Sequence, residues 1–374
     1  MLEALALQYL PQGRALEPRE LWAWGRYVAL HEAVRVPLVG GHMLAAALAR
    51  TVARRAAPPR DRALERAVRQ RYWTLLAVDF ENARRGVYPE ALLFDVPLSA
   101  YGAALPRFVL DAPSILARID AGDFQDLPAD VDLSAFPAYY RRTFHWQTDG
   151  YFSRHSAELY DLGVELLFVG TADVMRRQAL AEVLRRKPRG PVRLLDVGTG
   201  TARFLRQARV SLPGSELHGV DLSPWYVGHA RRELARGSDE AGAAALPRVD
   251  VANAESLPFP DASFDVVTSI FVLHELPRRV RRAVLREMQR VLVPGGLLVL
   301  EDAAQPSEAS DLLQLLAQFS KDMHEPFFAD YQEDDLAELL SEAGFTAVRT
   351  QSHFVAKVVS GTKGLAGRRV PGVH

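Results

Sequence analysis

The chain has 374 residues and contains no cysteine. Disulfide bonds, thiolate nucleophiles and cysteine-ligated metals are therefore excluded. Its formal net charge is −1, so no strong field attracts nucleic acid or an anionic membrane surface. The sequence also lacks an apolar run of about 18 residues that could span a membrane, and its N-terminus lacks the features of a secretory signal. These absences predict a cytoplasmic globular protein that binds neither nucleic acid nor a membrane.

Helical and strand-forming patterns divide the chain into three predicted parts. A mainly helical N-terminal domain, for substrate selection or homodimer formation, is expected over residues 1–135, because the segment 120–137 is rich in Asp and Pro and has little periodicity. Lid and connecting helices are expected over residues 136–190. From 191 to 374, short apolar runs alternate with helical segments. This alternation is typical of an α/β domain with a parallel sheet and helices on both faces.

The segment LLDVGTGTARF, residues 194–204, indicates a ligand site. An apolar strand runs into a glycine turn and then a helix, so backbone N–H groups can approach a ligand at the carboxyl edge of the sheet. Asp221 follows Gly200 by 21 residues and ends the second strand, where a carboxylate can bind both ribose hydroxyls. A dinucleotide fingerprint would need glycine at Arg203. Asp196 also suits a cationic ligand better than a pyrophosphate, so S-adenosylmethionine fits better than NAD.

Six ordered motifs resemble the class I S-adenosylmethionine-dependent methyltransferases, in the group of the ubiquinone/menaquinone C-methyltransferases. The resemblance runs from about Tyr160 to Lys363. It implies a Rossmann-like doubly wound sheet of seven strands in the order 3-2-1-4-5-7-6, with strand 7 antiparallel, beside the added helical N-terminal domain. The motifs are YD at 160–161, LLDVGTGTARF, HGVDLS at 218–223, NAESLPFPDASFDVV at 253–267, VLHELP at 272–277 and VLVPGGLLVLED at 291–302.

The resemblance also implies which residues hold the cofactor, S-adenosylmethionine. Asp196 and the two motif glycines would line its methionine end, and Asp221 would hold the ribose. Asn253 stands where many relatives have Asp, and Ala202 replaces a third glycine of the loop. The implied cofactor-binding residues are Tyr160, Asp196, Gly198, Thr199, Gly200, Asp221, Leu222, Asn253, Ala254 and Phe271.

The segment FHWQTDGYFSRHS, residues 144–156, has dense aromatic and polar residues without a regular period. In the family that it resembles, the segment before the first strand folds over the open edge of the cofactor. We therefore expect either a lid that forms part of the substrate wall or an inter-domain seam, and one segment could be both. Candidate catalytic residues are His274, Glu275, His145 and Asp149, and a base is needed only if the acceptor must lose a proton.

Candidate substrate-binding residues come from the same segment and from FSKDMHEPFFADY, residues 319–331. Ordinary packing explains these aromatic residues equally well, and a helix-start cap is the alternative for the His274–Glu275 pair. HEAVR at 31–35 and HELPR at 274–278 lack the second histidine of the zinc-binding HExxH motif, and no metal site is predicted. The candidates for substrate binding are Trp146, Tyr151, Phe327, Phe328 and Tyr331.

The sequence thus predicts an enzyme that transfers the methyl group of S-adenosylmethionine to a C, N, O or S nucleophile of a small molecule by in-line displacement. A protein or RNA methyltransferase is one alternative. Against it, the chain lacks a basic stripe with interleaved aromatic residues and has VLHEL in place of an NPPY-type tetrapeptide. A non-catalytic cofactor-binding scaffold is the other alternative.

Overall fold

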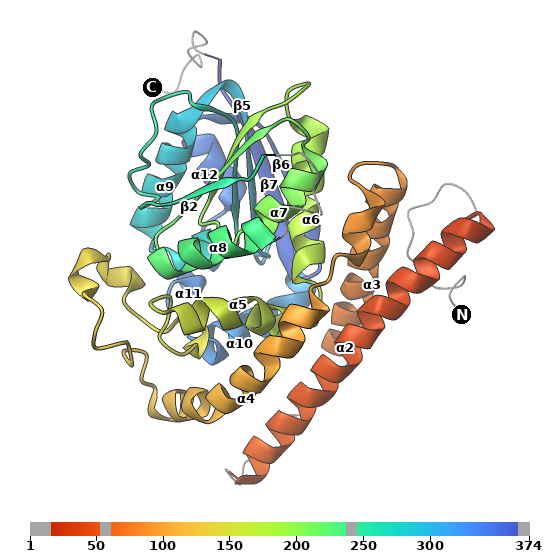
Figure 1. Ribbon diagram of the computed structural model, residues 1–374, viewed down its shortest axis with the longest axis vertical. Coiled ribbons are helices and arrows are strands. Elements are labelled where there is room, and N and C mark those ends of the chain that lie inside the picture. Colours follow the sequence, from red (N-terminus) through yellow and green to blue (C-terminus); the bar gives the residue numbers. More distant parts are fainter. Residues whose placement is uncertain (1–15, 53–60, 237–244, 366–374) are drawn as a thin grey trace.

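The computed structural model describes residues 16–52, 61–236 and 245–365 (Figure 1). Its centre is a seven-stranded sheet in the order β3-β2-β1-β4-β5-β7-β6. Strands β1 to β5 run parallel, whereas β7 is antiparallel to both β5 and β6. The predicted fold class, strand order and antiparallel strand 7 are therefore confirmed. The strands are β1 (Arg193–Val197), β2 (Glu216–Asp221), β3 (Arg248–Val251), β4 (Phe264–Ile270), β5 (Leu292–Ala303), β6 (Phe345–His353) and β7 (Ala356–Lys363).

Helices cover both faces of the sheet, and others extend from one side (Figure 1). Short 3-10 helices link several of them. The α-helices are α2 (Pro18–Val52), α3 (Arg62–Arg84), α4 (Leu98–Ala121), α5 (Arg154–Leu167), α6 (Ala172–Arg186), α7 (Arg203–Ser211), α8 (Pro224–Arg236), α9 (Arg278–Val291), α10 (Leu313–Asp322), α11 (Phe328–Glu333) and α12 (Leu336–Glu342). The 3-10 helices are η1 (Glu90–Phe94), η2 (Leu133–Ala135), η3 (Ala138–Tyr140), η4 (Phe144–Trp146), η5 (Leu273–Glu275) and η6 (Ser310–Leu312).

The alternation of side chains along each strand builds two hydrophobic layers. On β1, Leu194 joins the layer under α6, α7 and α8, whereas Leu195 joins the layer under α9 and α12. Adjacent residues of a strand point to opposite faces, so near-continuous apolar strands bury both faces. The parallel connections bring the ends of β1, β2, β4 and β5 to one edge, and α5, α10 and α11 gather at that end of the sheet (Figure 1).

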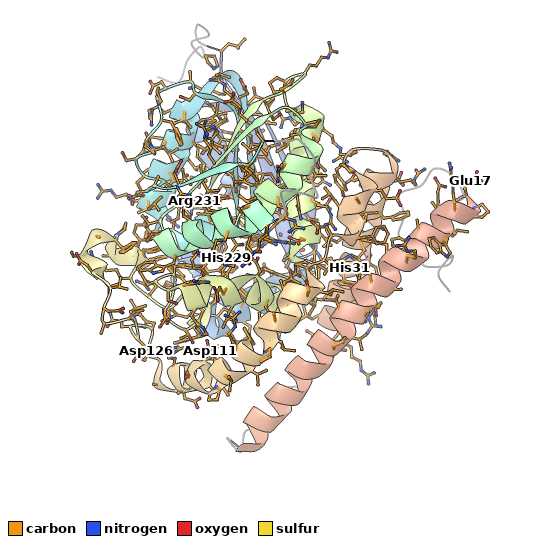
Figure 2. The ribbon with its side chains drawn as sticks, viewed as in Figure 1. Glu17, His31, Asp111, Asp126, His229 and Arg231 are labelled. Atoms are coloured by element: carbon orange, nitrogen blue, oxygen red, sulfur yellow. The ribbon has the colours of Figure 1, made fainter. Side chains whose placement is uncertain are left out.

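The N-terminal helices pack onto the same core as the sheet. Aromatic and aliphatic residues of α2 and α3 share one hydrophobic cluster with α6, α7 and the strands. A buried carboxylate joins them: Asp79 of α3 accepts hydrogen bonds from Tyr27 (2.6 Å) and Tyr88 (2.6 Å), and two from Arg177 of α6 (2.8 and 2.7 Å). His31 on α2 is also buried (Figure 2). The predicted division into domains stays a prediction.

A second connection ties α3 to the C-terminal hairpin. Arg71 binds both carboxylate oxygens of Asp311 and donates to the carbonyl of Phe354 at 3.0 Å. Across the described ranges no helix is long and apolar enough to cross a membrane. Residues 1–15, in the N-terminal part of the chain that lacks the features of a secretory signal, lie outside the described residues.

Candidate active site

The turn between β1 and α7 forms the floor of the candidate site. Gly198 has φ +73° and Gly200 has φ +54°, a left-handed conformation that glycine adopts without strain. A Cβ placed on Gly198 would lie 2.5 Å from Cγ2 of Val272. Backbone N–H groups of Gly198 and Thr199 both donate to the carbonyl of Val220, at 2.8 and 2.9 Å. This turn therefore holds the ends of β1 and β2 together and leaves no room for a side chain at its first position.

Asp221 lies at the end of β2, beside the glycine turn. Its Oδ2 accepts a hydrogen bond from the N–H of Gly200 at 2.8 Å, and its Oδ1 accepts from the N–H of Ser223 at 2.9 Å. Burial raises the pKa of this carboxyl, although the backbone N–H groups oppose the shift. The remaining lone pairs of the two oxygens can accept hydrogen bonds from ligand hydroxyls. Asp221 could therefore bind the ribose, which is the role predicted for it.

Asp196 lies on β1 beneath the turn and is 2% exposed. Its Oδ1 accepts from the hydroxyl of Thr268 on β4 at 2.7 Å. Burial raises the pKa of Asp196 to about 7, because the charged form has lost its hydration. A cation at this position would restore the ionised form.

The other predicted cofactor residues surround the same edge. Asn253 follows β3, and its Oδ1 accepts from the N–H of Glu255 at 2.9 Å, so this oxygen already caps its own turn. Phe271 follows β4 with φ +56° and stacks on Phe168 at 5.4 Å. Tyr160 on α5 contacts the ring of Tyr226 at 5.3 Å. Leu222 and Ala254 are half-buried after β2 and β3, and Thr199 lies buried in the turn between Gly198 and Gly200.

Residues 144–156 cross the carboxyl edge of the sheet. The hydroxyl of Tyr151 donates to Oε1 of Glu275 after β4 at 2.7 Å, and the carbonyl of Tyr151 accepts from the hydroxyl of Ser223 after β2 at 2.6 Å. Trp146 is buried, and its Nε1 donates to the carbonyl of Asp322 at 2.8 Å. The segment thus contacts residues that follow β4 and β2 and the end of α10, which places it where a lid would lie. Its function as a lid stays a prediction.

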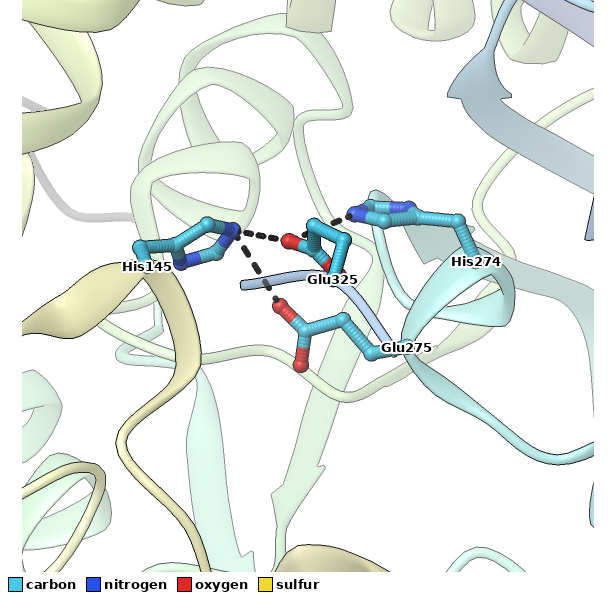
Figure 3. Close-up of side chains that lie close together, drawn as sticks. All are labelled: His145, His274, Glu275 and Glu325. Carbon is cyan, nitrogen blue, oxygen red and sulfur yellow. Dashed lines mark ion pairs between the residues drawn. The ribbon is translucent and has the colours of Figure 1, made fainter. Parts of the chain in front are cut away.

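Three of the four predicted catalytic residues come together with a fourth residue that was not predicted. His145, His274 and Glu275 surround the carboxylate of Glu325 (Figure 3). His145 Nε2 forms an ion pair with Glu325 and lies 3.9 Å from Oε1 of Glu275, and His274 Nε2 lies 3.9 Å from Oε1 of Glu325. Burial alone would lower the pKa of His145, but Glu325 and Glu275 outweigh it and raise this pKa above its ordinary value.

His274 is held by a carboxylate from β5. Its Nδ1 lies 2.6 Å from Oδ1 of Asp302, and Asp302 also accepts from the N–H groups of Leu273 and Ala303, at 2.8 and 2.7 Å. Burial opposes the charged imidazole, but Asp302 and Glu325 outweigh it and raise the pKa of His274 to about 10. Burial and Glu325 raise the pKa of Glu275 to about 7. These groups can hold or move a proton at the edge of the sheet.

The remaining candidates lie elsewhere. Asp149, with φ +63°, lines an open cavity of about 620 Å³ together with Trp225 and does not belong to the four-residue cluster. Phe328 and Tyr331 are buried at 1% and 0% exposure, and their rings are steeply tilted to that of His274, with centroids 6.0 and 6.1 Å away. Phe327 is half-buried under the guanidinium of Arg142. Catalytic and substrate-binding roles for these residues stay predictions.

Glu325 was not among the residues predicted from the sequence, although it lies in the predicted substrate-binding segment 319–331. Glu325 lies between α10 and α11, and its side chain is fully buried. A signal was available, because His324–Glu325 is a pair of titratable residues among aromatic residues. Nothing in that pattern shows which of them turns inward; His324 instead stacks on Phe124 at 4.8 Å.

Comparisons with known proteins agree with this geometry. The sequence model of the family described as "Methyltransferase domain" matches residues 195–300. The chain is similar to a protein named demethylmenaquinone methyltransferase from Deinococcus radiodurans, with 39% identity over 40% of this chain and 58% of that protein. It is also similar to a ubiquinone/menaquinone biosynthesis C-methyltransferase from Geobacter sulfurreducens, with 32% identity over 56% of this chain and 86% of that protein.

Similarity to solved structures is weaker. A protein of an O-methyltransferase family from Burkholderia thailandensis has 19% identity, a TM-score of 0.45 and coverage of 57% of this chain and 61% of that chain. The two sequence relatives, together with the fold and the motifs described above, show the class of protein to which this chain belongs. The chain belongs to the class I S-adenosylmethionine-dependent methyltransferases, in the group similar to the ubiquinone/menaquinone C-methyltransferases. It is an enzyme whose cofactor is S-adenosylmethionine.

The residues present fit this cofactor. Gly200 has a left-handed backbone, and a Cβ at its position would meet no atom within 4 Å, so a ligand can approach the backbone of the turn here. Asp196 is a buried carboxylate that a cation would stabilise in its ionised form. Asp221 offers oxygen atoms at the end of β2 for ribose hydroxyls. We therefore propose that Asp196 and the turn hold the cationic methionine part and that Asp221 holds the ribose.

Proposed function

We propose that this enzyme methylates a small aromatic acceptor of the quinol type, at the carboxyl edge of the sheet. The names of the relatives from Deinococcus radiodurans and Geobacter sulfurreducens support this acceptor class. When bound, S-adenosylmethionine supplies a sulfonium-bound methyl group, which the nucleophilic atom of the acceptor attacks in line with the carbon–sulfur bond. The chain's own residues orient the acceptor toward this methyl group and exclude water from the site.

The hydrogen bond from Tyr151 to Glu275, at 2.7 Å, is the observation that carries the proposal. It links the segment before β1 to the loop after β4 and so closes the edge beside the cofactor turn. An aromatic cluster lies behind it, formed by Phe144, Tyr151 and Tyr226 with Tyr160 packed against them. Aromatic rings that surround a few polar groups are typical of a small-molecule site.

Burial of the polar groups favours a small molecule over a macromolecule. The side chains of His145 and Glu275 are 17% and 14% exposed, and that of Glu325 is fully buried. A side chain of a protein acceptor or a base of RNA would have to enter an edge already crossed by residues 144–156. Methylation of a protein or RNA is the second candidate function, and no specific observation favours it.

The direct test is to incubate the purified full-length chain with S-adenosylmethionine and demethylmenaquinol, prepared by chemical reduction of demethylmenaquinone, and to analyse the product by mass spectrometry. We expect a product one methyl group heavier, and none from the Asp221→Ala variant. Asp250→Ala is the matched control, because Asp250 is an exposed carboxylate on the neighbouring strand β3. Transfer to protein or RNA, with none to quinol-type acceptors, would replace this proposal by the second candidate.

A further inference from the structure

Four potential ligand atoms converge where the sequence predicted no metal site. One atom each from His145, His274, Glu275 and Glu325 lies within 4.8 Å of the others. They come from three separate parts of the chain: η4, η5 and the loop between α10 and α11. In Figure 3 the two imidazoles and the Glu275 carboxylate point toward Glu325 from different sides. Such convergence of imidazole and carboxylate groups is the arrangement that a metal ion requires.

A hydrogen bond to Asp302 fixes the orientation of the His274 ring. Asp302 accepts from its Nδ1 at 2.6 Å, so the proton lies on Nδ1 in the neutral ring and the lone pair of Nε2 faces the cluster. Asp302 is itself held by the N–H groups of Leu273 and Ala303. A carboxylate behind a histidine is the usual outer partner of a metal-binding imidazole, because it sets the tautomer and raises the basicity of the ligand nitrogen.

Glu325 is the second observation that points to an ion. Its side chain is 0% exposed, and its Oε2 accepts no hydrogen bond from any described residue. A buried carboxylate requires a cation or several donors. Its described neighbours in the cluster are two imidazoles and a second carboxylate, Glu275. His145 forms an ion pair with it, and His274 Nε2 is 3.9 Å away, too far for a hydrogen bond. Two ligands of one tetrahedral ion, each about 2.1 Å from it, lie about 3.4 Å apart, so a small adjustment would let these atoms share an ion.

We propose that His145, His274, Glu275 and Glu325 bind one divalent first-row transition-metal ion at the carboxyl edge of the sheet. Two imidazole nitrogens and two carboxylate oxygens suit Zn²⁺, Fe²⁺, Co²⁺ or Mn²⁺, whereas Mg²⁺ and Ca²⁺ prefer oxygen ligands alone. The site itself rests on the geometry of the cluster. Its use, to hold an acceptor oxygen beside the cofactor, rests on the proposed function.

The test uses the full-length chain, stripped with a chelator and then titrated with Zn²⁺ in a calorimeter. We expect one ion per chain and a loss of affinity of at least about 100-fold in His145→Ala and in Glu325→Ala, since each removes a ligand. His155→Ala is the matched control: His155 also pairs with a carboxylate, Asp111, at 2.8 Å, but away from the cluster. This control should bind Zn²⁺ as the unmodified chain does.

Asp302 is a positioning residue, so we expect its substitution to weaken metal binding less than the loss of a ligand does. Asp302→Asn keeps the shape but replaces an acceptor by an NH₂ donor that must face a backbone N–H or the imidazole, and we expect metal affinity to fall by about 10- to 100-fold. Asp111→Asn makes the same change behind His155 and should leave metal affinity unchanged (Figure 2). A merely structural effect of Asp302→Asn would lower the unfolding temperature without this selective loss of metal affinity.

X-ray absorption on the unmodified chain loaded with one Zn²⁺ keeps the test independent of how the variants fold. Scattering from two imidazoles with oxygen ligands supports the site. Absence of stoichiometric binding for Zn²⁺, Mn²⁺, Fe²⁺ and Co²⁺ overturns it, and so does affinity that is equal in His145→Ala and the unmodified chain. Methyl transfer, measured on the same samples, separates the claims. A metal-free chain that transfers methyl groups as fast as the loaded chain refutes the use of the metal, and a metal-loaded chain without any methyl transfer refutes the proposed function but not the site.

Discussion

Gly198 and Val272 lie against each other so closely that a Cβ on the glycine would be 2.5 Å from Cγ2 of the valine. The contact joins the turn after β1 to the start of the loop that carries His274 and Glu275. The turn proposed to hold the cofactor therefore packs directly against the loop of the proposed acceptor site, through Gly198 and Val272.

Gly198→Ala should weaken binding of S-adenosylmethionine by more than tenfold. The new methyl group meets Val272, and φ +73° is unfavourable for alanine. The measurement is calorimetric titration with the cofactor. Gly190→Ala is the matched control, since Gly190 has φ +80° but nothing within 4 Å of its Cβ position. Equal loss in both variants would show that backbone strain alone, and not the contact with Val272, determines the effect.

Cofactor affinity should rise with pH between 6 and 8. Burial raises the pKa of Asp196 to about 7, so the carboxyl is mostly protonated at pH 6 and mostly ionised at pH 8. A cationic cofactor binds the ionised form better, and the affinity should increase about five- to tenfold over this range. The stability of the cofactor-free protein should depend on pH with the opposite sign. Because folding raises the pKa of Asp196, the contribution of this group to the free energy of unfolding is lost as pH rises through about 7. Calorimetry of Asp196→Asn should give a flat profile, and a pH dependence that survives this change would contradict the assignment.

Asp79→Ala should destabilise the fold by about 3–5 kcal/mol, because it leaves the buried guanidinium of Arg177 without a counter-charge. Tyr27 and Tyr88 lose their shared acceptor as well. Chemical denaturation with a helix-sensitive probe measures the change. Asp95→Ala breaks a half-exposed pair with Arg206 and should cost no more than about 1 kcal/mol. A small loss in Asp79→Ala would mean that the apolar contacts of α2 and α3, with the Arg71–Asp311 pair, hold these helices without the buried carboxylate.

Tyr151→Phe should lower kcat/KM for the acceptor by about tenfold while the cofactor Kd stays unchanged. Removal of the hydroxyl deprives the Glu275 carboxylate, whose side chain is 14% exposed, of its donor at 2.7 Å, at an energetic cost of about 1–3 kcal/mol. Steady-state kinetics with varied acceptor measures this. The comparison is Tyr139→Phe, which removes a similar bond to the half-buried Glu255 at 3.0 Å and should leave the kinetics unaltered. If both variants behave alike, the link across the edge has no role in acceptor binding.

The sheet was predictable because its signals are local. Apolar strands that end in glycine turns, as at Gly198, recur with helices between them, and the resemblance to a family supplied the strand order. Asp196 and Asp221 were placed correctly at strand ends because the carboxyl ends of parallel strands share one edge.

The cluster around Glu325 was predictable only in part. His274 and Glu275 follow β4 directly, but their meeting with His145 and Glu325 depends on how two irregular segments cross the edge. Non-local contacts of loops leave no periodic signal in the sequence. For Tyr331 the sequence predicted contact with substrate; the structure shows it fully buried in the hydrophobic layer of α9 and α12, and its substrate-binding role stays a prediction.

The central claim is methyl transfer from S-adenosylmethionine to a small molecule at this edge. The most direct measurement supplies S-adenosylmethionine labelled in its methyl group to the purified chain with a fractionated extract of its host, and follows the label. The account predicts label in the low-molecular-weight fraction, lost in Asp221→Ala and kept in Asp250→Ala. Label in protein or RNA alone, or no transfer from a chain that binds the cofactor, would contradict it.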